Sequence, residues 1–115
     1  MLEEADWRVY RAQGFREAQE FLGSGGFPVV ITEHHLPDGD WRDLHYACAG
    51  MEGAPAVVVT ARHADDRLWA EVLSLGGHDL LVQPFQKEEV IRVCWSAWRE
   101  FIARKMGSGW AVGTA

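Results

Sequence analysis

Short apolar runs alternate with amphipathic segments along most of this chain. Three runs of four or five residues predict strands, and they lie at residues 29–32, 56–60 and 80–83. The first two have the length and the β-branched composition of buried parallel strands, and the third is a last short strand. Apolar residues recur at helical spacing in four other segments, which predicts helices over residues 15–22, 41–49, 65–75 and 86–105. Strands that alternate with helices through short loops predict a parallel sheet with right-handed crossovers.

The two ends of the chain carry weaker patterns. Residues 7–11 alternate apolar and polar side chains, which predicts one more short strand. Residues 1–6 are typical of the frayed end of a helix, and residues 107–115, rich in small side chains, predict a flexible tail. Residues 1–106 therefore form the one predicted domain.

The composition is that of an ordinary globular domain. Of the 115 residues, 48% are hydrophobic and 24% are charged, and the formal net charge is −6. Such an acidic chain offers no basic surface for nucleic acid and is repelled by anionic membranes. The first residues are too acidic for a secretory signal and no apolar run is long enough to span a membrane, so we expect a cytoplasmic location. Cys48 and Cys94 lack metal-binding spacing and are expected to be reduced, packed thiols.

Polar residues follow the first predicted strand where it ends. Three ionisable residues come directly after residues 29–32, namely Glu33, His34 and His35. Pro37 and Asp38 favour a tight turn, and Asp40 is placed to cap the helix that follows. Ligands collect outside the carboxyl ends of the strands in open α/β sheets. Glu33 therefore stands where function is expected.

Together these motifs resemble the receiver domains of two-component response regulators. The resemblance covers about residues 5–104 and depends on the order of four motifs: Glu33 followed by Leu36-Pro37-Asp38-Gly39, Thr60-Ala61 at a strand end, Gly76-Gly77, and Gln83-Pro84-Phe85. It implies a flavodoxin-like α/β fold, in which a five-stranded parallel sheet of order 2-1-3-4-5 carries helices on both faces.

The resemblance also implies a role for each site position. Glu33 occupies the phosphoacceptor position, which is normally aspartate. Thr60 supplies the hydroxyl that closes on the phosphoryl group, and Leu80 stands at the position of the switch aromatic. Gln83 stands at the position of the invariant lysine and is followed by a cis peptide bond to Pro84.

The amino-terminal end departs from the family pattern. Residues 7–11 align with the second strand of a receiver, so the first strand, its acidic Mg²⁺ ligands and most of the first helix are absent. Because the first strand lies between the second and the third, this N-terminally truncated sheet is expected to have an unfilled gap. Three repairs are open: a neighbouring chain supplies a strand, the tail around residues 110–114 fills the gap, or the sheet closes up.

The chemistry of the site argues against a working phosphoacceptor. Phosphorylation brings two anionic groups together, so it needs a divalent cation and a lysine to offset the repulsion. The chain has neither at the implied positions, and Glu33 is one methylene longer than aspartate. We therefore expect no ordinary phosphorylation, no Mg²⁺ or other cofactor, and no enzymatic activity. Glu33 is then either a mimic of the phosphorylated state that reaches toward Thr60 or a decayed site.

The five histidines raise the question of a metal site. His34 and His35 are adjacent, and adjacent residues rarely both reach one ion. No spaced third ligand is evident, so we predict no metal site. His45, His63 and His78 are predicted to be surface residues.

The helix predicted over residues 86–105 has more apolar residues than one core-facing stripe needs. The expected stripe comprises Val90, Ile91, Cys94, Ala97, Trp98 and Phe101. Val93, Trp95 and Ile102 lie outside it, and together with Trp69 on the preceding helix they predict an exposed interface patch. The alternative is that Trp95 and Ile102 cover the edge of an incomplete core.

The resulting hypothesis is a degenerate receiver, or pseudo-receiver, that acts in two-component signalling through protein contacts. Its expected partners are a second copy of the chain in a homodimer, a histidine kinase or an output domain. Two alternatives stay open: a pseudo-receiver that senses a small molecule, and an incomplete piece of a working response regulator that is completed in trans. A small flavodoxin-like enzyme is disfavoured because no phosphate-binding glycine loop follows a strand.

Overall fold

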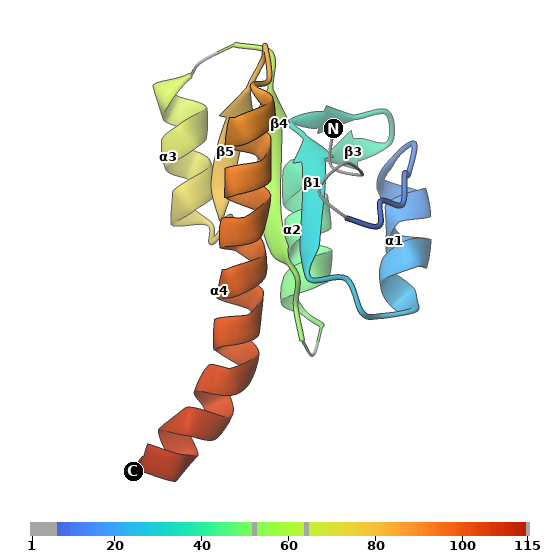
Figure 1. Ribbon diagram of the computed structural model, residues 1–115. Coiled ribbons are helices and arrows are strands. Elements are labelled where there is room, and N and C mark those ends of the chain that lie inside the picture. Colours follow the sequence, from blue (N-terminus) through green and yellow to red (C-terminus); the bar gives the residue numbers. More distant parts are fainter. Residues whose placement is uncertain (1–6, 52, 64, 115) are drawn as a thin grey trace.

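Figure 1 shows the computed structural model, which describes residues 7–51, 53–63 and 65–114, with side chains through Lys105. Three parallel strands form the central sheet in the order β1-β4-β5: β1 (Val29–Glu33), β4 (Ala56–Ala61) and β5 (Asp79–Val82). The helices of the described residues are α1 (Phe15–Gly23), α2 (Trp41–Ala49), α3 (Asp66–Ser74) and α4 (Lys87–Thr114). A small hairpin after β1 comprises β2 (His35–Leu36) and β3 (Gly39–Asp40). The predicted flavodoxin-like α/β class is confirmed.

The sheet has an apolar layer on each face because β4 is apolar along most of its length. Ala56 and Val58 pack against α4, whereas Val57 and Val59 pack against α1, α2 and α3. None of these four side chains is more than 2% exposed. A central parallel strand buried on both faces needs such a continuous apolar run, which is why its sequence was recognisable as a strand.

Aspartates fix the starts of α2 and α3, as the sequence predicted for the first of them. Asp40 accepts backbone hydrogen bonds at the start of α2, and the Asp43 carboxylate in turn accepts from the Asp40 N–H, which completes a capping box. Asp65 accepts from the first turn of α3 in the same way. Each cap satisfies N–H groups that have no partner within the helix.

The start of α1 is capped from a distant part of the chain. Gly14 precedes the helix and offers no side-chain cap. The two carboxylate oxygens of Asp38 accept the backbone N–H groups of Phe15 and Arg16 at 2.7 and 3.0 Å. Because Asp38 lies in the β2–β3 turn, this contact ties the loop after β1 to α1.

Two predictions at the chain ends are wrong. Residues 7–11 form no strand and run without regular structure beside β1. The last helix does not end near Lys105: α4 continues to Thr114, through residues expected to form a flexible tail. Residues 1–6, predicted as a helix end, lie outside the described residues.

The face that α4 turns toward the sheet also differs from the predicted stripe. Val93, expected outside the core, is 1% exposed, whereas Trp98, expected inside it, is 36% exposed. The buried residues of α4 follow the spacing of Val90, Val93, Cys94, Ala97 and Phe101. This stripe is rotated relative to the predicted one and turns Trp95 and Trp98 toward the side of β1.

The structure argues against two of the three repairs proposed for the missing strand. Residues 110–114 belong to α4, which projects beyond the sheet, so they do not fill the gap (Figure 1). The sheet has not closed up either, because in the described part of the chain β1 pairs with β4 alone. No helix of the described residues is long and apolar enough to cross a membrane.

Candidate signalling site at the carboxyl ends of the strands

The three central site residues gather at one rim of the sheet. Glu33 ends β1 and is the register partner of Thr60 on β4. Gln83 follows β5 directly, and its N–H donates to the Ala61 carbonyl at 2.9 Å. Parallel strands bring their carboxyl ends to the same edge, so residues separated by about fifty positions lie on adjacent strand ends.

The side chains at this rim face water rather than one another. Glu33 and Gln83 are exposed, and Thr60 is half-buried. Among the described residues no hydrogen bond joins the Glu33 carboxylate to the Thr60 hydroxyl. The two residues are neighbours through the pairing of their strands. Leu80 is 7% exposed and belongs to the core on the α2 side of the sheet. The peptide bond between Gln83 and Pro84 is cis, as the resemblance implied.

The loop after Glu33 is held to the rim by backbone contacts. The His34 N–H donates to the Thr60 carbonyl at 2.9 Å, and the His34 carbonyl accepts from the Trp41 N–H at 3.2 Å. The rings of His34 and His35 are stacked, with centroids 4.1 Å apart. Partial burial, and then the neighbouring charge of His35, lowers the pKa of His34 below its ordinary value of 6.5. Both effects favour the uncharged form of the His34 ring.

The polar residues of the hairpin act on the backbone. Asp38 and Asp40 are occupied as caps of α1 and α2. The backbone N–H groups of Arg16 and Phe15 hold the pKa of the Asp38 carboxyl below its usual range. Pro37 is exposed in the turn between β2 and β3. In the described residues no three His, Cys, Asp or Glu side chains are grouped so that they could hold a metal ion.

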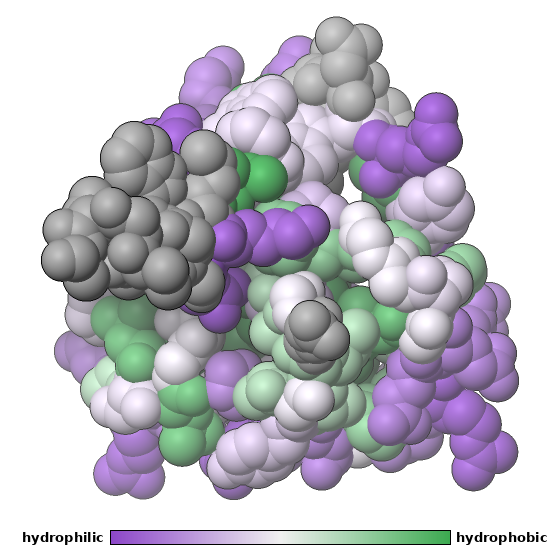
Figure 2. Space-filling view, turned by 90° about the horizontal axis from the view of Figure 1, so that it is seen from below, coloured by the Kyte–Doolittle hydropathy of each residue, from purple (hydrophilic) through white to green (hydrophobic). Residues whose placement is uncertain are grey.

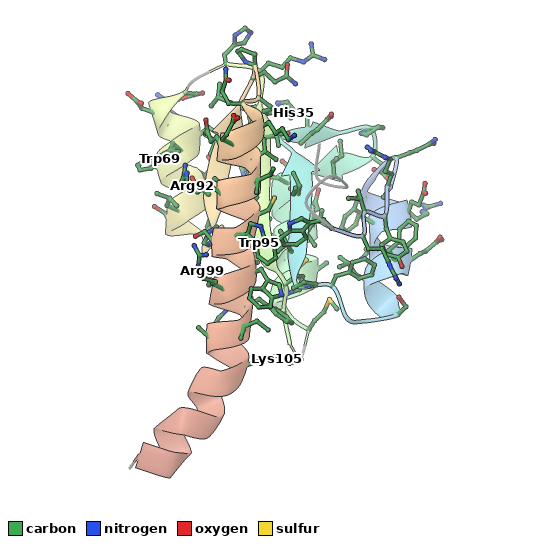
Figure 3. All side chains as sticks on the ribbon, in the orientation of Figure 1. His35, Trp69, Arg92, Trp95, Arg99 and Lys105 are labelled. Carbon is green, nitrogen blue, oxygen red and sulfur yellow. The ribbon has the colours of Figure 1, made fainter. Side chains whose placement is uncertain are left out.

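The residues proposed as an interface do not form a single patch. Trp69 lies on α3 and is 50% exposed. Trp95 lies on the other side of α4, where its ring packs against Trp7 at 5.0 Å and Trp98 at 5.6 Å between centroids (Figure 3). Ile102 is half-buried farther along α4. The Trp95 side of α4 thus faces β1, and the Trp69 surface is separate from it.

Sequence reasoning missed a polar link between β5 and α4. His78 is not a surface residue: its Nδ1 lies 3.0 Å from the Glu100 carboxylate and its Nε2 lies 3.1 Å from the Ser96 hydroxyl. Ser96 and Glu100 are four residues apart on α4, and this spacing was the one available signal. Because backbone N–H groups within a helix are already bonded, Ser96 has no oxyanion donors beside it. We interpret the three side chains as a structural clamp.

His45 also departs from its predicted surface position. It is half-buried, and its Nε2 donates to the Leu75 carbonyl at 2.6 Å, which joins α2 to the end of α3. Its Nδ1 is buried without a hydrogen-bond partner. His63 is exposed, as predicted.

Comparisons of sequence lead to a family of signalling proteins. The chain is 34% identical over 94 residues to the swarming motility regulation protein RssB of Serratia marcescens, covering 78% of this chain and 41% of that protein. It is 33% identical over 92 residues to the virulence transcriptional regulatory protein PhoP of Salmonella typhimurium, covering 78% and 40%. No family model matches the chain.

Comparisons of structure find the same fold. The receiver domain of the Francisella response regulator 1452 superposes with a TM-score of 0.74 at 21% identity, covering 85% of this chain and 81% of that one. The beryllofluoride-activated NtrC4 receiver domain dimer gives a TM-score of 0.77 at 24% identity, covering 87% and 83%.

The fold, and the site residues at the carboxyl ends of its strands, define a flavodoxin-like α/β domain of the signalling type. With the curated relatives, they show that the chain belongs to the receiver domains of response regulators. The chain spans about two fifths of the length of the curated relatives that it matches.

Proposed function

We propose that this chain is a degenerate receiver that signals through protein contacts and takes up no phosphoryl group by the ordinary receiver reaction. The side chains at the rim support this proposal most. The register sets Glu33 beside Thr60, and Gln83 follows the next strand. The resemblance assigns these positions to a phosphorylation site, and two of their side chains differ from the family pattern.

Both differences oppose the reaction. The amide of Gln83 donates hydrogen bonds but carries no charge to neutralise the phosphoryl oxygens. The extra methylene of Glu33 moves the attacking oxygen by about 1 Å, and a misplacement of that size costs about a hundredfold in rate. Among the described residues no three His, Cys, Asp or Glu side chains are grouped to hold a metal ion, and we propose that Mg²⁺ has no role here.

Intact-mass analysis after incubation with acetyl phosphate and Mg²⁺ tests this proposal. We expect no phosphoryl adduct on the chain, while a working receiver domain in the same reaction is modified. A stoichiometric adduct that disappears in Glu33→Gln would contradict the proposal. Glu33→Gln keeps the length of the side chain, so its folding should match that of the original chain.

A module that works by contact needs a partner surface, and we propose that α3 provides one for a second copy of the chain. Trp69 and Leu73 on α3 are 50% and 40% exposed, and large apolar side chains in water are typical of interfaces. Light scattering should show a dimer that Trp69→Glu dissociates, while Tyr46→Glu, at a 60% exposed aromatic on α2, leaves it intact. A monomer at high concentration would remove this part of the proposal.

A further inference from the structure

The outer edge of β1 has no neighbouring strand within the described residues. β1 pairs with β4 along its whole length, and the sheet ends there. A strand with one free edge presents a row of backbone donors and acceptors to any extended segment that reaches it.

The hydrogen bonds to β4 show which residues face that edge. The Pro28 carbonyl accepts from the Ala56 N–H, and the His34 N–H donates to the Thr60 carbonyl, both at 2.9 Å. In a parallel ladder both backbone groups of a residue point to one side, and successive residues alternate. Even-numbered residues from 28 to 34 thus bond to β4. The residues that direct their N–H and C=O groups away from β4 are Val29, Ile31 and Glu33.

A groove of about 1280 Å³ runs along this edge, and all five β1 residues line it. We call it the edge groove. Aromatic side chains line it in two groups that belong to opposite layers of the domain. On the α4 side the rings in contact are Trp7, Trp95 and Trp98. On the α1 side they are Tyr10, Phe21 and Phe27.

The edge groove leaves apolar surface in water that a parallel sheet normally buries. Ile31, in the middle of β1, is 39% exposed, and Tyr10, Trp95 and Trp98 are 53%, 39% and 36% exposed. Hydrophobic side chains also reach the surface among polar ones in the view from below (Figure 2). Parallel strands are covered on both faces by packed layers, and exposed apolar side chains gathered along one groove mark an interaction site.

The shape of the edge groove indicates which kind of molecule fits into it. The aromatic groups stand on both sides of β1, so we expect a second folded copy, which carries helices on both faces of its own sheet, to fit less well than a single strand. Residues 1–6 hold three acids and are unsuited to burial between apolar layers. One extended strand without flanking helices fits.

We propose that the edge groove binds one extended segment of another polypeptide, which adds to β1 as a further parallel strand of the sheet. The outward backbone groups of Val29, Ile31 and Glu33 hydrogen-bond to the segment, and its side chains are apolar on both faces because it lies between two aromatic walls. A basic residue at its carboxyl end faces Glu33, the one acidic residue among the described residues that line the groove. This inference rests on the proposed function of signalling through protein contacts. It specifies the partner as an extended apolar segment with a basic residue at its carboxyl end.

Titration with a designed peptide tests the proposal. The probe is acetyl-SVLIVVKS, whose apolar core matches β1 in length and whose lysine reaches Glu33 in the parallel register. We expect saturable binding with a blue shift of tryptophan emission, because Trp7, Trp95 and Trp98 line the groove. A peptide N-methylated at the amides that face β1 should bind at least tenfold more weakly, and lysine to glutamate in the peptide should weaken binding severalfold.

Two protein variants of similar exposure complete the test. Ile31→Lys places a charge in the groove, and Phe85→Lys places one outside it and away from α3, where the original side chains are 39% and 37% exposed. Ile31→Lys should lower the affinity at least tenfold and Phe85→Lys should leave it unchanged, with circular dichroism to confirm that both fold. No peptide binding, equal loss in both variants, or peptide-free self-association that Ile31→Lys abolishes would overturn the proposal. Phosphoryl uptake is measured separately by mass, so failure of either proposal is visible by itself.

Discussion

The two edge strands of the sheet are completed in different ways. In β5 the central residues Leu80 and Leu81 are 7% and 2% exposed, and His78 just before the strand is bonded to α4. In β1 the central residue Ile31 is 39% exposed, and the backbone groups beyond it face a groove. Helical layers that close over an edge strand protect it, whereas layers that stand apart leave a place for another strand.

The largest expected effect is a difference in stability between two variants, each with one side chain shortened to alanine in one of the two edge strands. Leu81→Ala should lower the free energy of unfolding by about 3 kcal/mol, because it leaves a cavity between β5 and α4. Ile31→Ala should cost about 1 kcal/mol or less, because its side chain is already partly in water. Urea denaturation of both variants measures the difference. Equal losses would mean that the edge at β1 is as well packed as the edge at β5.

The reactivity of the two cysteines compares the layer beside the outer edge of β1 with the layer on the other face of the sheet. Burial raises the pKa of both thiols to about 11, so neither reacts readily near neutral pH in the folded chain. Cys94 lines the edge groove, whereas Cys48 belongs to the core on the other face. Local opening should be easier beside the unfinished edge.

We therefore expect Cys94 to be labelled severalfold faster than Cys48 by an uncharged thiol reagent. Time-resolved mass mapping gives both rates, and Cys48→Ser and Cys94→Ser identify each signal. Equal rates would show that the two layers open together.

The smallest expected effect concerns the Asp38 cap, which holds α1 beside the groove. The depressed pKa of Asp38 means that its stabilising contact is present above the unfolded value of 3.8 and is lost as the pH falls through the folded value. The melting temperature of Asp38→Asn should lie slightly below that of the original chain near pH 7, and the two should converge in acid. Thermal unfolding between about pH 3 and 7 measures this, and a constant difference at all pH values would contradict it.

Sequence reasoning predicted the elements whose signals are local. The apolar runs of β1, β4 and β5, the Asp40 cap and the turn after β1 each follow from a few neighbouring residues. The rim could be predicted as well, because the ends of parallel strands meet wherever strands and helices alternate. The sequence therefore predicts that Glu33, Thr60 and Gln83 share one edge of the sheet.

The errors occur where structure depends on distant partners. Residues 7–11 have the alternation of a strand, but a strand forms only when its backbone pairs with a neighbour, and these residues pair with no strand of the described chain. The face of α4 was misjudged because the same apolar excess permits two stripes, and packing on Val58 and Leu81 selects the one with Val93 inside. The clamp of His78 with Ser96 and Glu100 joins residues about twenty positions apart, which periodicity does not reveal.

Amide hydrogen exchange along β1 of the free chain tests the central claim most directly. If the outer edge is open, the amides of Val29, Ile31 and Glu33 should exchange fast, while those of Val30 and Thr32, bonded to β4, should exchange slowly. Uniform protection of all five amides would show that the edge is already occupied and would contradict the account.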